Sequence, residues 1–277
     1  MSKIHISQAE IYPPPFLKWA GGKKLLLPKI LPHMPTRYKI YHEPFMGGAA
    51  LFFASQPQQA QLSDLNYKLV STFIGVRDNV EEIIEQLDQI PIDEETYYRI
   101  RSRAPKSLVE EAAKFIYLNK ACWNGLYREN KKGEFNVPFG LRDKQKSLVV
   151  TEPEKLRRAS KVLQNKIITH QDFKSAMELP KEGDFVYLDP PYTVSHNHNG
   201  FIEYNAAIFS WEDQVALAEI AKDLRIKGVK ILISNADHTS IRKLYEDFDL
   251  ITISRSSTIA SNKKNRRKVT ELLIKGF

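Results

Sequence analysis

The sequence predicts an α/β fold, a doubly wound and mostly parallel sheet, from three observations. Short apolar runs rich in β-branched and aromatic residues alternate with amphipathic helical patterns near both ends of the chain. From about residue 67 to residue 123, one helical pattern instead follows another, as in "NVEEIIEQLDQI". A glycine turn in "LYRENKKGEFNVPFG" then separates two short runs. We therefore expect a mainly helical insertion that carries a hairpin or an ordered loop.

Boundary signals place the individual elements along the chain. Strands are expected at "YKIYHE", "AQLSD", "KIITH", "DFVYLD", "VKILIS", "DLITIS" and "VTELLIKGF". One helix should start at Ala49, after the paired glycines of "MGG". A second should begin at Thr151 as its cap, with Glu154 three positions on. A third should run from the cap Ser210 to a stop at Gly228.

The composition indicates a globular protein with an anionic partner. A length of 277 residues suits one or two domains at about 150 residues each. Lys and Arg number 41 against 33 Asp and Glu, and this net charge of +8 favours nucleic acid. Cys122 is the only cysteine, so no internal disulfide forms, and no stretch approaches the roughly 20 apolar residues of a membrane span. We expect a soluble cytoplasmic protein.

The stretch "VYLDPPY" ends an apolar strand at an acid, two prolines and an aromatic ring: Asp189, Pro190, Pro191 and Tyr192. Many proline pairs only stop a strand. The alternative is a rigid reactive turn at the carboxyl edge of the sheet, where open α/β folds bind their ligands. Proline fixes φ, so the carbonyl groups of such a turn would be held in place.

Three earlier segments bear on a ligand site. "FLKWAGGK" lacks the P-loop pattern, so that type of phosphate loop is not favoured. "HEPFMGG" puts an acid and two glycines at a strand-to-helix turn, where backbone can approach a ligand closely. Asp64 ends the next strand about 20 residues later, where an acid binds a ribose diol or, with equal weight, caps the following helix.

Two basic segments suggest contacts with nucleic acid. "NKACWNGLYRENKKGEFNVPFGLRDKQK" interleaves lysine and arginine with aromatic residues, which suits base readout and stacking better than an ordinary solvated hairpin. "SNKKNRRK" is either a solvated loop or a phosphate clamp. The loop after the proline turn holds His196 and His198 without a third ligand nearby, so we expect no metal site.

Six motifs occur together and in order: "FLKWAGGK", "EPFMGG", "LSDLN", "NKACWNGLYRENKKGEFNVPFG", "LDPPY" and "ISRSSTIASN". This set resembles the Dam-type family of DNA adenine-N6 methyltransferases, across nearly the whole chain. The resemblance implies a Rossmann-like methyltransferase sheet with an inserted, mainly helical DNA-recognition domain carrying a β-hairpin. Residues 1–66 and 147–277 would form the catalytic S-adenosylmethionine-binding domain, and residues 67–146 the target-recognition domain.

The resemblance also implies roles for particular residues. The catalytic set is Asp189, Pro190, Pro191 and Tyr192. The cofactor, S-adenosyl-L-methionine, would be bound by Trp19, Lys23, Glu43, Phe45, Asp64 and Asp189. Double-stranded DNA would be contacted by Trp123, Asn124, Leu126, Arg128, Asn130, Asn136, Pro138, Arg142, Lys263 and Lys264. The family implies no metal, and we expect a monomer in the bacterial cytoplasm, associated with the nucleoid.

The chemistry explains why such a family needs this turn. The exocyclic amine of adenine is a poor nucleophile because its lone pair is delocalised into the ring. Asp189 and the Pro190 carbonyl can each accept one amine hydrogen, and Tyr192 offers a face for stacking. A base inside a duplex must first be flipped out to reach the turn. Arg128 would then read the guanine before the target adenine in GATC or a related GA-containing site.

One position departs from the family. After "NVPFG" relatives have an arginine and a tyrosine, whereas this chain has Leu141 and Arg142. Arg142 either selects the last base pair through a guanine or clamps a phosphate. Methylation of RNA or protein by a similar turn, and a DNA-binding protein without catalysis, are the alternative functions. The sequence leaves open whether the enzyme accompanies a restriction nuclease or acts alone.

Overall fold

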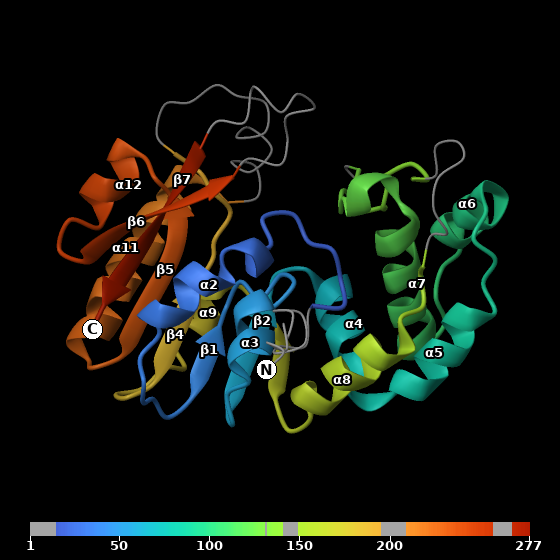
Figure 1. Ribbon diagram of the computed structural model, residues 1–277, viewed down its shortest axis with the longest axis horizontal. Helices are drawn as coiled ribbons and strands as arrows, with labels where there is room; N and C mark the ends of the chain where they lie inside the picture. Colours follow the sequence, from blue (N-terminus) through green and yellow to red (C-terminus); the bar gives the residue numbers. More distant parts are fainter. Residues whose placement is uncertain (1–14, 131, 141–148, 195–208, 257–267) are drawn as a thin grey trace, which may run out of the picture. The chain divides into compact units, whose positions relative to one another are not determined.

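The computed structural model describes residues 15–130, 132–140, 149–194, 209–256 and 268–277. Its strands form one seven-stranded sheet in the order β3-β2-β1-β4-β5-β7-β6. They are β1 (Tyr41–Glu43), β2 (Ala60–Asp64), β3 (Ile167–His170), β4 (Phe185–Leu188), β5 (Lys230–Ala236), β6 (Asp249–Ser256) and β7 (Lys268–Gly276). Strands β2, β1, β4 and β5 pair in parallel, while β7 lies antiparallel between β5 and β6 (Figure 1). The predicted doubly wound, mostly parallel fold is thereby confirmed.

The chain divides into two compact units. The first comprises residues 1–24, 47–56 and 66–170, and the second comprises residues 25–46, 57–65 and 171–277. Residues 147–170, which hold a helix and β3, therefore group with the helical segment rather than with the remaining strands. The division of the chain into catalytic and recognition domains by function stays a prediction.

Helices make up most of the first unit. They are α3 (Ala50–Ser55), α4 (Tyr67–Asp78), α5 (Val80–Asp88), α6 (Glu94–Ser102), α7 (Leu108–Ala121) and α8 (Pro153–Leu163), with a 3₁₀ turn η3 (Trp123–Gly125). Helix α7 packs against α4, α5 and α6 (Figure 1). A Cβ atom on Gly75 of α4 would lie 2.8 Å from the Ala112 Cβ of α7. The glycine therefore allows these two helices to pack closely.

The start of α8 corrects one expectation. Thr151 is not its N-cap: the helix begins at Pro153, and the residue before it, Glu152, makes no side-chain capping bond. Proline suits the first helical position because its missing N–H is one that the helix leaves unpaired. The Glu152 carboxylate instead pairs with Lys120 of α7 and Lys155 of α8.

The second unit buries one apolar face of its sheet under helices. Its helical elements are α2 (Leu27–Ile30), η2 (Leu31–His33), α9 (Phe173–Ala176), α11 (Trp211–Ile226) and α12 (Thr239–Leu244), and η1 (Lys23–Leu25) spans the boundary of the two units. Alternate residues Val186 and Leu188 of β4 join Ile231 and Ile233 of β5 in a core with Leu217 of α11. Because strand residues alternate between faces, Tyr187 and Ser234 point to the opposite face.

The cap of α11 agrees with the sequence. Ser210 and Asp213 form a reciprocal capping box, and Gly228 follows the helix with φ of +80°. In the part of the chain that the structure describes, no helix is both long and apolar enough to cross a membrane.

Replacing Ser210 with Ala should lower the free energy of unfolding by about 1 kcal/mol, because the Asp213 amide loses its acceptor. Chemical denaturation measures this loss. Ser102→Ala, which removes an exposed hydroxyl at the end of α6, is the matched control and should change stability by less than about 0.5 kcal/mol. Equal stability of Ser210→Ala and the native protein would show that the capping box contributes nothing.

Candidate functional site

The proline turn follows β4 directly and is fixed from behind. The carbonyl of Pro191 accepts a hydrogen bond from Gln214 Nε2 of α11 at 3.1 Å. Asn235 Nδ2 of β5 donates in turn to Gln214 Oε1 at 3.1 Å, and both amide side chains are fully buried. The Thr193 hydroxyl donates to the Phe209 carbonyl at 2.7 Å. The backbone on both sides of Tyr192 is thus tied to other elements of the second unit.

Tyr192 is held at its tip as well. Its hydroxyl donates to Glu271 Oε2 of β7 at 2.8 Å. Burial raises the pKa of Tyr192 well above its usual value, and the negative charges of Asp189 and Glu271 raise it further. The hydroxyl therefore stays protonated at neutral pH and donates to Glu271.

Three carboxylates share one face of the sheet near its carboxyl edge. Glu43 ends β1, Asp189 follows β4, and Glu271 pairs in register with Ala236 at the end of β5. Their charges all raise the pKa of buried Tyr187, after the larger effect of burial itself. The Tyr187 hydroxyl is 2.8 Å from Ser234 Oγ. This face therefore gathers acids and hydroxyl groups near the carboxyl edge of the sheet.

Glu43 and Asp64 end neighbouring parallel strands. The side chain of Glu43 is almost fully buried, and its Oε2 accepts from the Tyr41 hydroxyl at 2.7 Å. Asp64 is partly exposed at the end of β2. The alternative that Asp64 caps the following helix is wrong, because the cap of α4 is Asn66, whose Oδ1 accepts from the Leu69 amide.

Phe45 belongs to an aromatic group beside the same strand end. Its ring stacks on Phe173 of α9 at a centroid distance of 5.6 Å and meets Phe209 edge-on at 5.5 Å. Phe45 itself stays partly exposed. The second unit therefore offers an apolar ring next to two acidic strand ends.

In the first unit, the paired glycines accommodate Trp19. Gly47 has φ of +45°, and a Cβ atom there would lie 2.8 Å from Trp19 Cδ1. The Trp19 rings stack in turn on Tyr127 at 5.3 Å and Phe115 at 6.4 Å. The close approach that the glycines allow is thus, in this structure, the approach of an indole side chain.

The segment around Trp19 is anchored to the end of α7. Buried Asn119 pairs with the main chain of Lys18 in both directions, accepting from its amide at 2.9 Å and donating to its carbonyl at 2.7 Å. Lys23 is buried, and its ammonium donates to the Gly21 carbonyl at 2.9 Å.

The predicted hairpin is a loop closed by isolated bridges. Cys122 bridges Phe139, and Glu129 bridges Phe135. A Cβ atom on Gly140 would meet the Cys122 carbonyl oxygen at 2.5 Å, so only glycine lets the two arms approach this closely. The Tyr97 hydroxyl donates to the Val137 carbonyl at 2.8 Å and ties the returning arm to α6.

Some residues of this loop point inward, and others are exposed to solvent. Tyr127 turns inward, and its hydroxyl donates to Glu129, which also pairs with Lys68 of α4. The predicted DNA contacts that lie on the exposed side are Asn124, Leu126, Arg128, Asn130 and Pro138, while Trp123 and Asn136 are partly exposed. The structure therefore brings seven of the ten predicted contacts together in residues 122–140. Arg142, Lys263 and Lys264 lie outside the described residues.

Arg128 is oriented by its neighbour across the loop. Its Nε donates to Asn136 Oδ1 at 2.7 Å, which leaves the guanidinium on the exposed side. Asn130 organises the tip, because its Oδ1 accepts from the amides of Lys132 and Glu134. Asn130 and Asn136 therefore shape the loop in addition to any contact with DNA.

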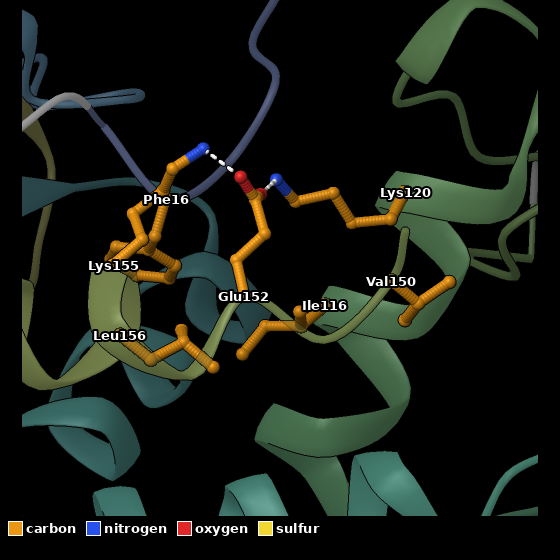
Figure 2. Close-up of a pocket in the computed structure, with 7 residues that line it drawn as sticks. All are labelled: Phe16, Ile116, Lys120, Val150, Glu152, Lys155 and Leu156. Carbon is orange, nitrogen blue, oxygen red and sulfur yellow. Dashed lines mark hydrogen bonds and ion pairs between the residues drawn. The ribbon is translucent and has the colours of Figure 1, made fainter. Parts of the chain in front are cut away.

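Figure 2 shows a small pocket in the first unit, lined by Phe16, Ile116, Lys120, Val150, Glu152, Lys155 and Leu156. Glu152 pairs there with Lys120 and Lys155. Burial lowers the pKa of the Lys120 ammonium, against the raising effect of the Glu152 carboxylate. The single carboxylate bridges the two ammonium groups and joins α7 to α8, so we assign this pocket a structural role. Elsewhere too, the described residues include no group of His, Cys, Asp and Glu suited to a metal ion.

Sequence reasoning missed the residues that hold the site. Gln214, Asn235 and Asn119 stand in ordinary helix and strand patterns, and nothing in the sequence distinguishes them. Glu271 carried a signal, since it is an acid within the apolar strand "VTELLIKGF".

Comparison with known proteins finds similar sequences over nearly the whole chain. A Type II methyltransferase of Lactococcus lactis subsp. cremoris is 38% identical over 273 residues, which cover 95% of each chain. A Type II methyltransferase of Methanocaldococcus jannaschii is 35% identical, covering 95% of this chain and 99% of the relative. The DNA adenine methylase of Escherichia coli K12 is 35% identical over 93% of each chain. The model of the D12 class N6 adenine-specific DNA methyltransferases matches residues 19–259, and the chain therefore belongs to this family of enzymes.

Proposed function

We propose that the protein transfers a methyl group to N6 of a flipped-out adenine in double-stranded DNA, within GATC or a related GA-containing site. The observation that carries this proposal is the turn after β4, where Asp189 precedes two prolines and a tyrosine that is fixed at its tip. Adenine methylation in DNA is the activity of the family and of relatives at about a third identity.

The turn can make the amine nucleophilic. Asp189 accepts one amine hydrogen, and the Pro190 carbonyl accepts the other, so the nitrogen lone pair localises away from the ring. After the nitrogen has gained the methyl group it carries an excess proton, which the Asp189 carboxylate can take. The contribution of the protein lies mainly in positioning and in preorganised acceptors.

S-adenosylmethionine, when bound, supplies an electrophilic methyl group and needs acceptors for its ribose hydroxyls and its ammonium group. The described residues fit it, because Glu43 and Asp64 end adjacent parallel strands and Phe45 adds an apolar ring beside them. Asp64 would hold the ribose hydroxyls. Trp19 and Lys23 stay predicted contacts of the same cofactor, and the chemistry requires no metal ion.

The loop of residues 122–140 carries the proposed DNA recognition. Arg128 would bind the guanine before the target adenine through two hydrogen bonds, the usual major-groove contact of arginine. Trp123 would occupy the space that the flipped base leaves, with Asn124 near the orphaned partner base. Leu126 and Pro138 would touch neighbouring bases. Lys263 and Lys264 would clamp phosphates, and Arg142 would select the last base pair.

Other features of the proposal concern assembly and location. We propose a monomer in the bacterial cytoplasm, consistent with a single, buried cysteine whose pKa burial raises to about 11. The names of two relatives suit a partner restriction nuclease. Mapping modified bases in DNA from cells that lack adenine methylation, with and without the expressed protein, tests the activity and its recognition site. RNA from the same cells tests the alternative substrate.

Asp189→Ala should lower the rate of methyl transfer by at least about two to three orders of magnitude, because a preorganised acceptor is lost. Transfer of labelled methyl groups to a duplex measures the rate, and fluorescence anisotropy checks that DNA binding survives. Asp223→Ala on the exposed side of α11 is the matched control. Turnover of Asp189→Ala close to that of the native protein would remove Asp189 from the catalytic set.

Asp64→Ala should weaken the binding of S-adenosylmethionine by about tenfold or more, since buried ribose hydroxyls lose their acceptor. Calorimetry with the cofactor measures this. Asn66→Ala is the control: it removes the cap of α4 and should cost about 1 kcal/mol of stability without changing cofactor affinity. Unchanged affinity in Asp64→Ala would contradict the ribose assignment.

Arg128→Ala should cost ~1–3 kcal/mol of discrimination at one guanine, because a direct base contact is lost. Binding to cognate and singly mismatched duplexes measures it. Asn136→Ala should produce a smaller loss at the same base pair, since it removes the acceptor that orients the guanidinium. Lys132→Ala, on the same loop, should weaken binding to all duplexes alike. An Arg128→Ala variant that behaves like Lys132→Ala would show that Arg128 contacts only the backbone.

A further inference from the structure

Packing alone does not explain the acidic residue Glu271 in β7. Glu271 pairs in register with Ala236 of β5 and Ile253 of β6, and its neighbours along the strand, Leu272 and Leu273, are fully buried. The side chain of Glu271 is itself only 3% exposed. A buried carboxylate costs several kcal/mol unless donors satisfy it, so an apolar residue would serve the sheet better.

What Glu271 does contact is the ring of the reactive turn. Its Oε2 accepts the hydroxyl hydrogen of Tyr192 at 2.8 Å. The high pKa of Tyr192 keeps that hydrogen in place, so the carboxylate accepts and the tyrosine donates. Hydrogen bonds of this kind, with a charged acceptor, are the strong ones in proteins.

The bond restricts the last freedom of the ring. The backbone before Tyr192 is fixed by two prolines and by Gln214, and the backbone after it is fixed through Thr193. Two side-chain torsions then remain. The bond to Glu271 fixes the position of the phenol oxygen and therefore the first torsion. It also favours one ring plane about the second torsion, because a phenol O–H lies in the plane of its ring. Donation to an anion also makes the ring richer in electrons, which favours stacking on a base that gains positive charge.

We propose that Glu271 is a positioning residue for methyl transfer, which orients the Tyr192 ring for stacking against the target adenine. This inference rests on the proposed function, because it concerns the same turn. It assigns to β7, which supplies none of the predicted site residues among its described positions, a part in the reaction.

The test combines three variants of the full-length protein. Tyr192→Phe removes the donor and keeps the ring, Glu271→Leu removes the acceptor, and Glu271→Gln keeps an uncharged acceptor. Each of the first two should lower kcat by about 10- to 100-fold, the range of a charge-assisted hydrogen bond, with little change in the KM for DNA. The double variant should be no slower than the slower single variant, and Glu271→Gln should recover part of the rate.

A fluorescent base separates orientation from stability. With 2-aminopurine in place of the target adenine, emission should be higher for Glu271→Leu than for the native protein, because a misoriented ring quenches less. Tyr245→Phe is the matched control: it removes another buried hydroxyl of the second unit, one without a hydrogen-bond partner among the described residues, and should leave kcat unchanged. If Glu271→Leu does not fold, Tyr192→Phe tests the same bond from its other end.

The outcomes are distinct. Native protein that methylates no adenine in duplex DNA would overturn both the proposed function and this inference. Active native protein together with full kcat in Tyr192→Phe and in the folded Glu271 variants would overturn the inference alone. Additive losses in the double variant would also overturn it, because they would show that the two residues act independently.

Discussion

The burial of charge at the carboxyl edge of the sheet is the constraint on which the second unit depends. Glu43 and Glu271 are almost fully buried, and a buried carboxylate persists only where donors satisfy it. Tyr41 donates to Glu43 and Tyr192 donates to Glu271, so two tyrosines are held by the acids that they satisfy. The bond from Tyr192 helps to fix the turn that carries Asp189, and the proposed role of Asp189 as an acceptor of amine hydrogens requires such rigidity.

In the first unit, an ordered loop keeps its shape without regular strands. Residues 122–140 are held by two isolated bridges, by a glycine at the crossing of the arms, and by bonds to α4 and α6. Inward residues such as Tyr127 carry these contacts, and outward residues such as Arg128 remain exposed. Trp19 stacks on Tyr127, so the segment that contains the predicted cofactor contacts packs directly against the loop within this unit.

Membership of the family explains the motifs, and the structure explains why they need their neighbours. The paired glycines, for example, fit the Trp19 indole, and the proline turn is tied to Gln214 and Asn235, which belong to no motif. Substitutions at such supporting residues are therefore expected to affect activity as substitutions in the motifs do, because small displacements of a reacting group lower the rate by large factors.

The sequence by itself determined the strands and their order, the turn after β4 and the family, since hydrophobic period, glycine, proline and motif spacing are all local signals. Its capping pattern placed the start of α8 at Thr151, whereas Pro153 takes the first helical position and makes Glu152 the residue before the helix. It left Asp64 open between a cap and a ligand contact, and only the bond from Leu69 to Asn66 removed the cap. Tertiary structure alone decided which residues hold the site: Glu271 and Tyr192 are 79 positions apart, and only the pairing of β7 with β5 brings the acid to the turn.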